Sequence, residues 1–274
     1  MWLKKFKNIK NEIDVWIEDF FYRFPDYYTE KYHYILFPGG KRIRPILTLL
    51  SAKSIDRKNY KKVLPLASAI EIMHNFTLVH DDLPMMDNDR ERRGKPTLHV
   101  KYSEHTALLV GDGMIIKSLQ ALNELDLTKD HFKKLLNKFY STLICIIEGQ
   151  GIEMDMRKKN ATIGKKDIRT IVKKKTACLF AFSMWAGVFA VNPYFKYLKD
   201  IYDIGMFIGM AFQIKDDLMD RKSNEFGYHL LYGEKKAEKI MKKYTDYIVN
   251  KLKNLSDEWQ WILTLKDFLL TRTL

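Results

Sequence analysis

The chain has little of what several protein classes require. It contains only seven prolines and 13 glycines in 274 residues, which leaves few turn formers for an all-β fold. Its two cysteines, Cys145 and Cys178, are too few for a disulfide framework, and both lie in apolar, helix-like runs, so we expect buried, reduced thiols and a cytoplasmic protein. No stretch reaches roughly 18 consecutive apolar residues, so we predict no transmembrane segment.

Positive charge, in contrast, is abundant, with a formal net charge of +13. Nucleic-acid binding would require clustered Lys and Arg with a recognisable motif, and neither a recognition-helix pattern nor a zinc-finger spacing is present. Binding of an anionic substrate requires only a few cations near a site. A third explanation of the positive net charge is that lysines are scattered over solvated faces without a specific function. We attribute most of the excess to such scatter, expect a few cations to bind an anion, and predict no nucleic-acid partner.

The long segments are rich in Leu, Ile, Lys, Glu and Met, which favour helices. The sequence shows no low-complexity linker, no internal repeat and no alternating strand pattern that would argue against a single helical domain. We therefore predict one all-α domain over residues 1–274. The expected helices cover residues 5–24, 44–54, 63–83, 103–124, 129–158, 165–190, 195–221, 234–253 and 256–272. The first is amphipathic; we favour its docking on the core, with loose association at a membrane surface as the alternative.

The first acidic cluster occupies residues 80–89, HDDLPMMDND. The pair Asp81–Asp82 ends a helix-like run, and Pro84 stops the helix, so the chain can fold back and bring Asp87 near the pair. The basic pair Arg92–Arg93 follows at once. Carboxylates beside guanidinium groups suit a metal-bound diphosphate. A solvated charged loop would have no particular reason to place a cluster of acids directly before a pair of arginines, so we favour a binding site.

A second cluster occupies residues 212–220, FQIKDDLMD. Asp216 and Asp220 are four residues apart and share one helix face, with Asp217 beside them. Carboxylates this close repel one another unless a cation neutralises them. Taken alone, the motif fits a solvated acidic helix end equally well. If both clusters face one cavity, they form a cage for Mg²⁺ carrying a diphosphate, which indicates chemistry on an allylic diphosphate.

Three weaker signals accompany these clusters. Residues 38–45, PGGKRIRP, combine two glycines with three cations at the expected start of a helix, a pattern that suits anion binding but is also common in basic loops. Lys175–Thr176 offers a further cation and hydroxyl within a lysine run that could be plain surface. Gln150 and Gln213 lie in apolar stretches and could be site residues or hydrogen-bonded core amides.

In their order along residues 34–245, these motifs resemble the trans-isoprenyl diphosphate synthase family, also called polyprenyl synthetases. The bacterial short-chain branch, the farnesyl and geranylgeranyl diphosphate synthases, is most similar, because four residues separate Asp82 from Asp87. The resemblance implies an isoprenoid-synthase-type helical bundle around a central cavity. It also implies a homodimer that uses isopentenyl diphosphate and an allylic diphosphate.

The resemblance further implies roles for individual residues. Up to three Mg²⁺, with Mn²⁺ as a possible substitute, would be held by Asp81, Asp82, Asp87, Asp216, Asp217 and Asp220. Isopentenyl diphosphate would contact Gly40, Lys41, Arg44, His74 and Arg93. The allylic diphosphate would contact Arg92, Lys175 and, as a further candidate, Lys215. Thr176 and Gln213 would face the reacting carbons. The catalytic set would be Asp81, Asp82, Arg92, Lys175, Thr176, Gln213 and Asp216.

Product length requires a steric stop in the cavity. Each added five-carbon unit favours binding by about 4 kcal/mol at about 0.8 kcal/mol per carbon, so affinity alone would keep elongation going. The resemblance places the length-determining positions at Phe76 and Thr77, and an aromatic residue at position 76 suggests a C15 product. Phe76 could equally be ordinary core packing. We predict a farnesyl diphosphate synthase, with a geranylgeranyl (C20) synthase as the alternative.

Two features depart from the family pattern. The loop over residues 221–233 is shorter than the family's usual loop by more than about a dozen residues. It also lacks an expected lysine, for which Lys222 is a candidate substitute. Glu153 stands where an aspartate is usual. We expect weaker closure and slower turnover, and a catalytically weak or partner-dependent subunit is a further alternative. A terpene cyclase, which binds no second diphosphate, would normally lack the motif at residues 39–45.

Overall fold

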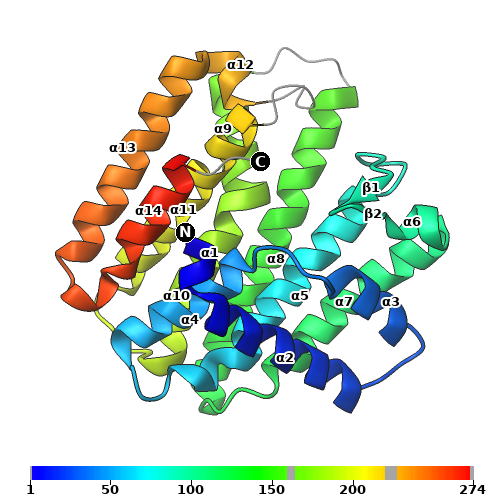
Figure 1. The fold of residues 1–274 in the computed structure, drawn as a ribbon, viewed down its shortest axis with the longest axis horizontal. Coiled ribbons are helices and arrows are strands. Elements are labelled where there is room, and N and C mark those ends of the chain that lie inside the picture. Colours follow the sequence, from blue (N-terminus) through cyan, green and yellow to red (C-terminus); the bar gives the residue numbers. More distant parts are fainter. Residues whose placement is uncertain (1, 159–163, 220–226, 272–274) are drawn as a thin grey trace.

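The protein is an assembly of helices, seen in a computed structural model that describes residues 2–158, 164–219 and 227–271 (Figure 1). Within these ranges the strands are limited to one short hairpin, so the all-α prediction is confirmed. The α-helices are α1 (Trp2–Lys5), α2 (Lys7–Arg23), α3 (Thr29–Leu36), α4 (Ile43–Ile55), α5 (Leu64–Asp81), α6 (Leu98–Lys101), α7 (Glu104–Leu122), α8 (Lys129–Lys158), α9 (Lys165–Val172), α10 (Cys178–Val191), α11 (Leu198–Met219), α12 (Tyr228–Tyr232), α13 (Glu234–Lys253) and α14 (Trp261–Thr271). The remaining elements are η1 (Tyr60–Val63), η2 (Lys173–Ala177), η3 (Asp257–Trp259), β1 (Glu91–Arg92) and β2 (Lys95–Pro96).

The predicted helices agree with these elements, with local differences. The bounds of α8 and α13 coincide with the expected ranges 129–158 and 234–253. The helix expected over residues 165–190 is continuous in direction but contains the π-helical turn η2. The short helix α3 and the hairpin were not predicted, because neither segment is long enough to show a clear apolar period.

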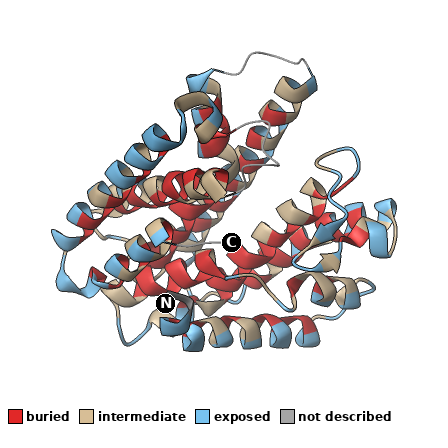
Figure 2. Ribbon diagram, turned by 45° about the horizontal axis from the view of Figure 1, so that its top comes forward, coloured by how far each residue is buried: buried red, intermediate tan, exposed pale blue. Residues whose placement is uncertain are grey.

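Helix α10 lies at the centre of the bundle and packs against α4, α8 and α11. Its sequence, CLFAFSMWAGVFAV, is apolar on all sides, as expected of a helix enclosed by others. Figure 2 shows buried residues concentrated in the interior helices and exposed residues along the outer faces. Among the described residues, Lys165–Val191 is the one stretch whose length and apolarity would fit a membrane span, and 67% of its most apolar window is buried within the protein.

The N-terminal helix α2 docks on this core. It buries one apolar face, formed by Ile9, Ile13, Ile17, Phe20 and Phe21. The helix also contacts α5 and α4, and α1 reaches α14 near the other end of the chain (Figure 1). The structure therefore has the docked arrangement that the amphipathic pattern favoured.

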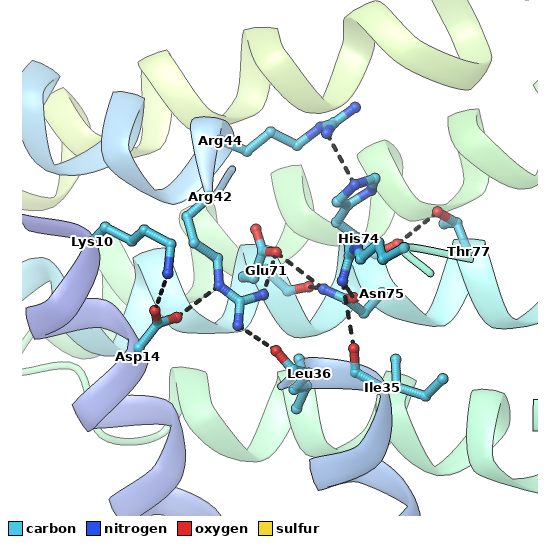
Figure 3. A network of polar contacts seen from close by, with 11 residues as sticks. Lys10, Asp14, Ile35, Leu36, Arg42, Arg44, Glu71, His74, Asn75 and Thr77 are labelled. Atoms are coloured by element: carbon cyan, nitrogen blue, oxygen red, sulfur yellow. Dashed lines mark hydrogen bonds and ion pairs between the residues drawn. The ribbon is translucent and has the colours of Figure 1, made fainter. Parts of the chain in front are cut away.

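A buried arginine joins α2, α3 and α5. Arg42 is only 2% exposed, and its Nε donates to Asp14 Oδ1 at 2.8 Å while its Nη1 donates to Glu71 Oε1 at 2.7 Å (Figure 3). Its Nη2 donates to the carbonyl oxygen of Leu36 at 2.6 Å. Burial would raise the pKa of the Glu71 carboxyl, but the charge and hydrogen bond of Arg42, together with the charges of Arg93 and Arg44, outweigh burial and lower it. Arg42 is thus a structural cation between three segments.

Replacing Arg42 with Met should lower the free energy of unfolding by about 3–5 kcal/mol, because Glu71 would remain buried without its counter-ion. Urea denaturation followed by circular dichroism measures this change. The matched control is Arg23→Gln, which breaks the exposed pairs with Asp19 and Glu124 and should cost about 1 kcal/mol or less. Equal losses in the two variants would contradict the structural role of Arg42.

Candidate active site

A cavity of about 990 Å³ opens between α4, α5, α8, η2 and α11. Its wall combines apolar side chains with a group of cations and carboxylates. Most of the predicted site residues lie in it: Gly40, Lys41, Arg44, His74, Phe76, Thr77, Asp81, Arg92, Arg93, Lys175, Thr176, Gln213 and Asp216. The fold therefore brings together motifs that are far apart in the sequence.

The two aspartate pairs meet this cavity in the same way. Asp81 and Asp216 line the cavity, whereas their neighbours Asp82 and Asp217 are only 3% and 1% exposed and do not. Successive residues of a helix point about 100° apart, so one member of each pair must face away. Asp217 accepts hydrogen bonds from Gln213 Nε2 at 2.9 Å and from the backbone N–H of Tyr228 at 2.8 Å.

Asp82 has a corresponding partner, since Arg92 Nε donates to its Oδ1 at 2.7 Å and Arg92 Nη2 forms an ion pair with the same oxygen at 2.5 Å. Asp82 and Asp217 were predicted to ligate metal, but the structure directs their carboxylates to Arg92 and Gln213 instead of the cavity. Burial raises the pKa of both carboxyls. We therefore assign them the role of orienting these two cavity residues.

The remaining predicted ligands differ in position. The chain folds back after Pro84 as expected, because the backbone N–H of Asp87 donates to the carbonyl oxygen of Asp81 at 2.8 Å. The Asp87 carboxylate pairs with Arg157. Asp220 and the candidate Lys222 lie outside the described residues. Lys215 does not line the cavity; its Nζ donates to the carbonyl oxygen of Leu270 at 3.0 Å.

The arginine pair after the first cluster belongs to the hairpin. Arg92 in β1 pairs with Lys95 in β2, and the turn residues Arg93 and Gly94 have φ of +57° and +73°. Two positive φ values in a two-residue turn are characteristic of type I′ hairpins. We had predicted no strand, and this is a correction: a two-residue Arg-Gly turn is a weak sequence signal. The hairpin carries both guanidinium groups to the cavity.

The glycine-rich motif separates its three cations. All three cations belong to residues that line the cavity, but the guanidinium of Arg42 turns into the core to Glu71 and Leu36. Gly40 leaves room for Arg93, since a Cβ there would lie 2.9 Å from Arg93 Nη2 and would make that side chain shift. The loop therefore holds two cations near the hairpin arginine.

Arg44 and His74 form a pair within this wall. Arg44 Nη1 lies 3.1 Å from His74 Nε2 (Figure 3). The guanidinium carbon of Arg44 also lies 4.4 Å from the ring centroid of Phe180. Burial lowers the pKa of Arg44 to about 10. Burial and the neighbouring charge of Arg44 also hold the pKa of His74 well below 6.5. We infer that His74 is neutral and accepts a hydrogen bond at Nε2 from Arg44.

The π-helical turn η2 presents Lys175 and Thr176 to the cavity. Such turns are frequent at functional sites because they redirect side chains inside a helix. Thr176 Oγ1 donates to Gln213 Oε1 at 2.9 Å, which continues the hydrogen bond from Gln213 to Asp217. Gly149 permits the approach of α8, since a Cβ there would lie 2.5 Å from the backbone nitrogen of Lys175.

The cavity has features that fit a charged ligand. Gln150 lines it, and both polar atoms of its amide are buried with no hydrogen-bond partner among the described residues. Burial, reinforced by Asp87 and Glu153, raises the pKa of Asp81 to about 7 despite the charge of Lys175. A cation beside Asp81 would relieve this penalty, and carboxylate oxygens are ligands that Mg²⁺ prefers.

The carboxylates alone do not form a closed metal site. Within the described residues, no group of three His, Cys, Asp or Glu side chains is close enough to hold a metal ion. Magnesium is usually held by one or two carboxylates together with substrate phosphates. The open arrangement of Asp81 and Asp216 therefore fits Mg²⁺ that arrives with a diphosphate.

Sequence reasoning missed one contributor, Arg157. It lies four residues after Glu153 on α8, and its Nη2 lies 2.6 Å from Glu153 Oε1. Glu153 is 7% exposed and also pairs through Oε2 with Lys175 Nζ at 2.8 Å. The i, i+4 spacing of Glu153 and Arg157 was the available signal, but it is common on solvated helix faces.

Comparisons with known proteins agree with this geometry. Residues 25–229 match the sequence profile described as "Polyprenyl synthetase". A short chain isoprenyl diphosphate synthase of Methanocaldococcus jannaschii is 36% identical over 216 residues, 78% of this chain and 63% of that protein. The chain thus spans less than two thirds of this relative.

Two further relatives carry different names. A geranylgeranyl diphosphate synthase of Methanosarcina mazei is 31% identical over 246 residues, 89% of this chain and 74% of that protein. A farnesyl diphosphate synthase of Bacillus subtilis is 31% identical over 224 residues, 80% of this chain and 74% of that protein. Sequence identity to relatives therefore does not distinguish a geranylgeranyl from a farnesyl diphosphate product.

The apo crystal structure of an FPP/GFPP synthase from Zymomonas mobilis resembles the fold with a TM-score of 0.89 at 25% identity. The match covers 98% of this chain and 100% of that chain. This agreement over nearly the whole length confirms the predicted type of helical bundle.

The ring of His74 should stay neutral in the ligand-free protein at pH values where an exposed imidazole, with a pKa of about 6.5, is already charged. Its folded pKa lies below 6.5, so the unfolded chain binds a proton there that the folded protein does not. His74 therefore makes stability fall as the pH drops below about 6.5. Ring ¹⁵N chemical shifts, assigned with a His74→Asn variant, measure the charge; an imidazolium signal at about pH 6 would contradict the pairing with Arg44.

Proposed function

Because the chain belongs to the polyprenyl synthetase family, we propose that it is a Mg²⁺-dependent trans-prenyltransferase that condenses isopentenyl diphosphate with dimethylallyl or geranyl diphosphate. One observation carries the proposal: Asp81 and Asp216, from clusters far apart in the sequence, line one cavity together with the cations Lys41, Arg44, Arg92, Arg93 and Lys175. We divide these cations between two diphosphates, whereas an enzyme that binds a single diphosphate needs fewer.

The cations divide according to their surroundings. Arg92 and Lys175 lie near the aspartates, where Arg92 pairs with Asp82 and the charge of Lys175 acts on Asp81. Lys41, Arg44 and Arg93 belong to the loop and hairpin side of the cavity, near His74. We assign the allylic diphosphate to the first group and isopentenyl diphosphate to the second.

This arrangement supports ionisation of the allylic carbon–oxygen bond. Bound Mg²⁺ would supply positive charge to the departing diphosphate, held through Asp81 and Asp216. Arg92 and Lys175 add fixed positive charge at the same oxygens, so negative charge that develops there is stabilised without reorganisation. The Thr176–Gln213 pair presents dipoles to the reacting carbons, and the apolar wall excludes water that would quench the cation.

We further propose farnesyl diphosphate, C15, as the product. Phe76 is 4% exposed, lines the cavity one and a half turns before Asp81, and packs edge-on against the ring of His80 at 5.8 Å. An aromatic ring held in this way is a rigid floor for a growing chain. The names of the relatives divide between farnesyl and geranylgeranyl synthases, so C20 is the second candidate.

The purified protein, given Mg²⁺, labelled isopentenyl diphosphate and either allylic primer, should release C15 products after dephosphorylation.

Phe76→Ala should shift most of the product to C20 or longer, because removing the ring opens space beyond the end of the growing prenyl chain. Phe76→Tyr keeps an aromatic ring and should retain the C15 product. An unchanged C15 product from Phe76→Ala would place the floor elsewhere. Absence of product with both primers, from folded protein, would favour a weak or partner-dependent subunit, as the short loop after Asp220 suggests.

We propose that the protein is a homodimer paired through the consecutive helices α7 and α8. Large apolar side chains are exposed on both at helical spacing: Leu108, Leu109, Ile116, Tyr140, Ile144 and Ile147. Ile147, 53% exposed, also lines the cavity, so a second copy would cover one of its walls.

Both cysteines are free thiols, and we propose on this basis a reducing, cytoplasmic location.

The dimer should dissociate when charge is introduced on this surface. Ile116→Glu combined with Ile144→Glu should convert the protein to a monomer by light scattering coupled to size exclusion. The matched control is Val15→Glu on α2, where the replaced side chain is 65% exposed, and it should leave the mass unchanged. A wild-type protein that elutes as a monomer would contradict the proposal.

A further inference from the structure

Arg157 connects the first aspartate cluster to α8. Its Nη1 lies 2.7 Å from Asp87 Oδ1, and its Nη2 lies 2.6 Å from Glu153 Oε1. The guanidinium thus joins two carboxylates on separate segments, the turn after α5 and the last turns of α8. Its side chain is one-third exposed, so it has room to change rotamer.

The surrounding charges explain why an arginine is stable there. Asp81, Asp87 and Glu153 are close enough that the last two raise the pKa of Asp81. Lys175 compensates Asp81 and Glu153, and Arg157 compensates Glu153 and Asp87. In the absence of other cations, Arg157 is therefore the counter-ion of Asp87, the carboxylate that the family resemblance assigned to metal.

A guanidinium and a divalent cation on the same carboxylate repel each other at short range. Metal at the first cluster therefore competes with Arg157 for Asp87. Glu153 gives the guanidinium a second anchor on its own helix, so Arg157 can release Asp87 while keeping its bond to Glu153. The long, unbranched side chain makes that movement possible without a change in the backbone.

We propose that Arg157 is an internal counter-ion that occupies Asp87 in the metal-free protein and must leave it before metal binds the first aspartate cluster. It is a positioning residue: it sets the metal affinity of the cluster and acts on substrate only through Asp87. The inference rests on the proposed function only for the kind of ligand, a hard divalent cation. Competition makes metal alone bind weakly, so a metal that arrives with a diphosphate is favoured.

The test measures metal binding without substrate, using Mn²⁺ and the electron paramagnetic resonance signal of the free ion. Arg157→Gln should lower the Kd for Mn²⁺ at least about tenfold, because a repelling positive charge is removed. Arg157→Lys keeps that charge and should remain within about threefold of the wild type. Lys158→Gln, an exposed neighbour on α8, makes the same change in net charge and should leave the Kd unchanged.

Thermal unfolding and circular dichroism first establish that each variant is folded. Unchanged or weaker Mn²⁺ binding by Arg157→Gln would overturn the inference, since a residue that merely supports the local structure gives that result. Equal tightening in Lys158→Gln would overturn it too, by assigning the effect to overall charge. If the wild type binds no Mn²⁺ but Arg157→Gln does, the counter-ion role is supported. Binding by neither protein overturns this inference but not the proposed metal site, which a diphosphate completes; the product assay with Mg²⁺ and both diphosphates tests that site separately.

Discussion

Buried carboxylates require nearby cations, and this constraint organises the molecule along α5. The helix begins its polar series with Glu71, which Arg42 neutralises, and ends at the pair Asp81–Asp82, opposed by Lys175 and Arg92. Asp87, just beyond the helix, pairs with Arg157. Each cation comes from a different segment, so the same charge pairs that stabilise the fold also place the α4 loop, the hairpin, η2 and α8 around one cavity.

Helix geometry then decides which charged groups face the cavity. In both aspartate pairs the first carboxylate lines the wall and the second is held by a partner behind it, Arg92 for Asp82 and Gln213 for Asp217. The buried aspartates orient groups that do reach the cavity. In each pair of adjacent aspartates, one carboxylate thus faces the cavity, and the other orients a neighbouring side chain that lines it.

The balance of charge also explains why the site suits a ligand that brings its own metal. Lys175 and Arg157 satisfy part of the negative charge of the first cluster, and within the described residues no three side chains form a closed metal cage. Diphosphate oxygens can complete the coordination and engage the remaining cations. Under the proposed function, binding of metal and substrate would then be coupled, and assembling the catalytic charges only around substrate would protect a reactive intermediate.

Sequence alone determined the helical class, most helix ranges and the positions of the two aspartate clusters near helix ends, because these depend on local composition and on residue spacing within single helices. By resemblance it also predicted residues 39–45, Lys175 and Gln213 as site residues, and Gly40, Lys41, Arg44, Lys175 and Gln213 do line one cavity. It did not determine that Arg42 enters the core while Arg44 lines the cavity, nor that Asp82 and Asp217 face away, nor that Arg157 reaches Asp87. These outcomes depend on the direction of each side chain and on partners distant in sequence, and only tertiary packing specifies both.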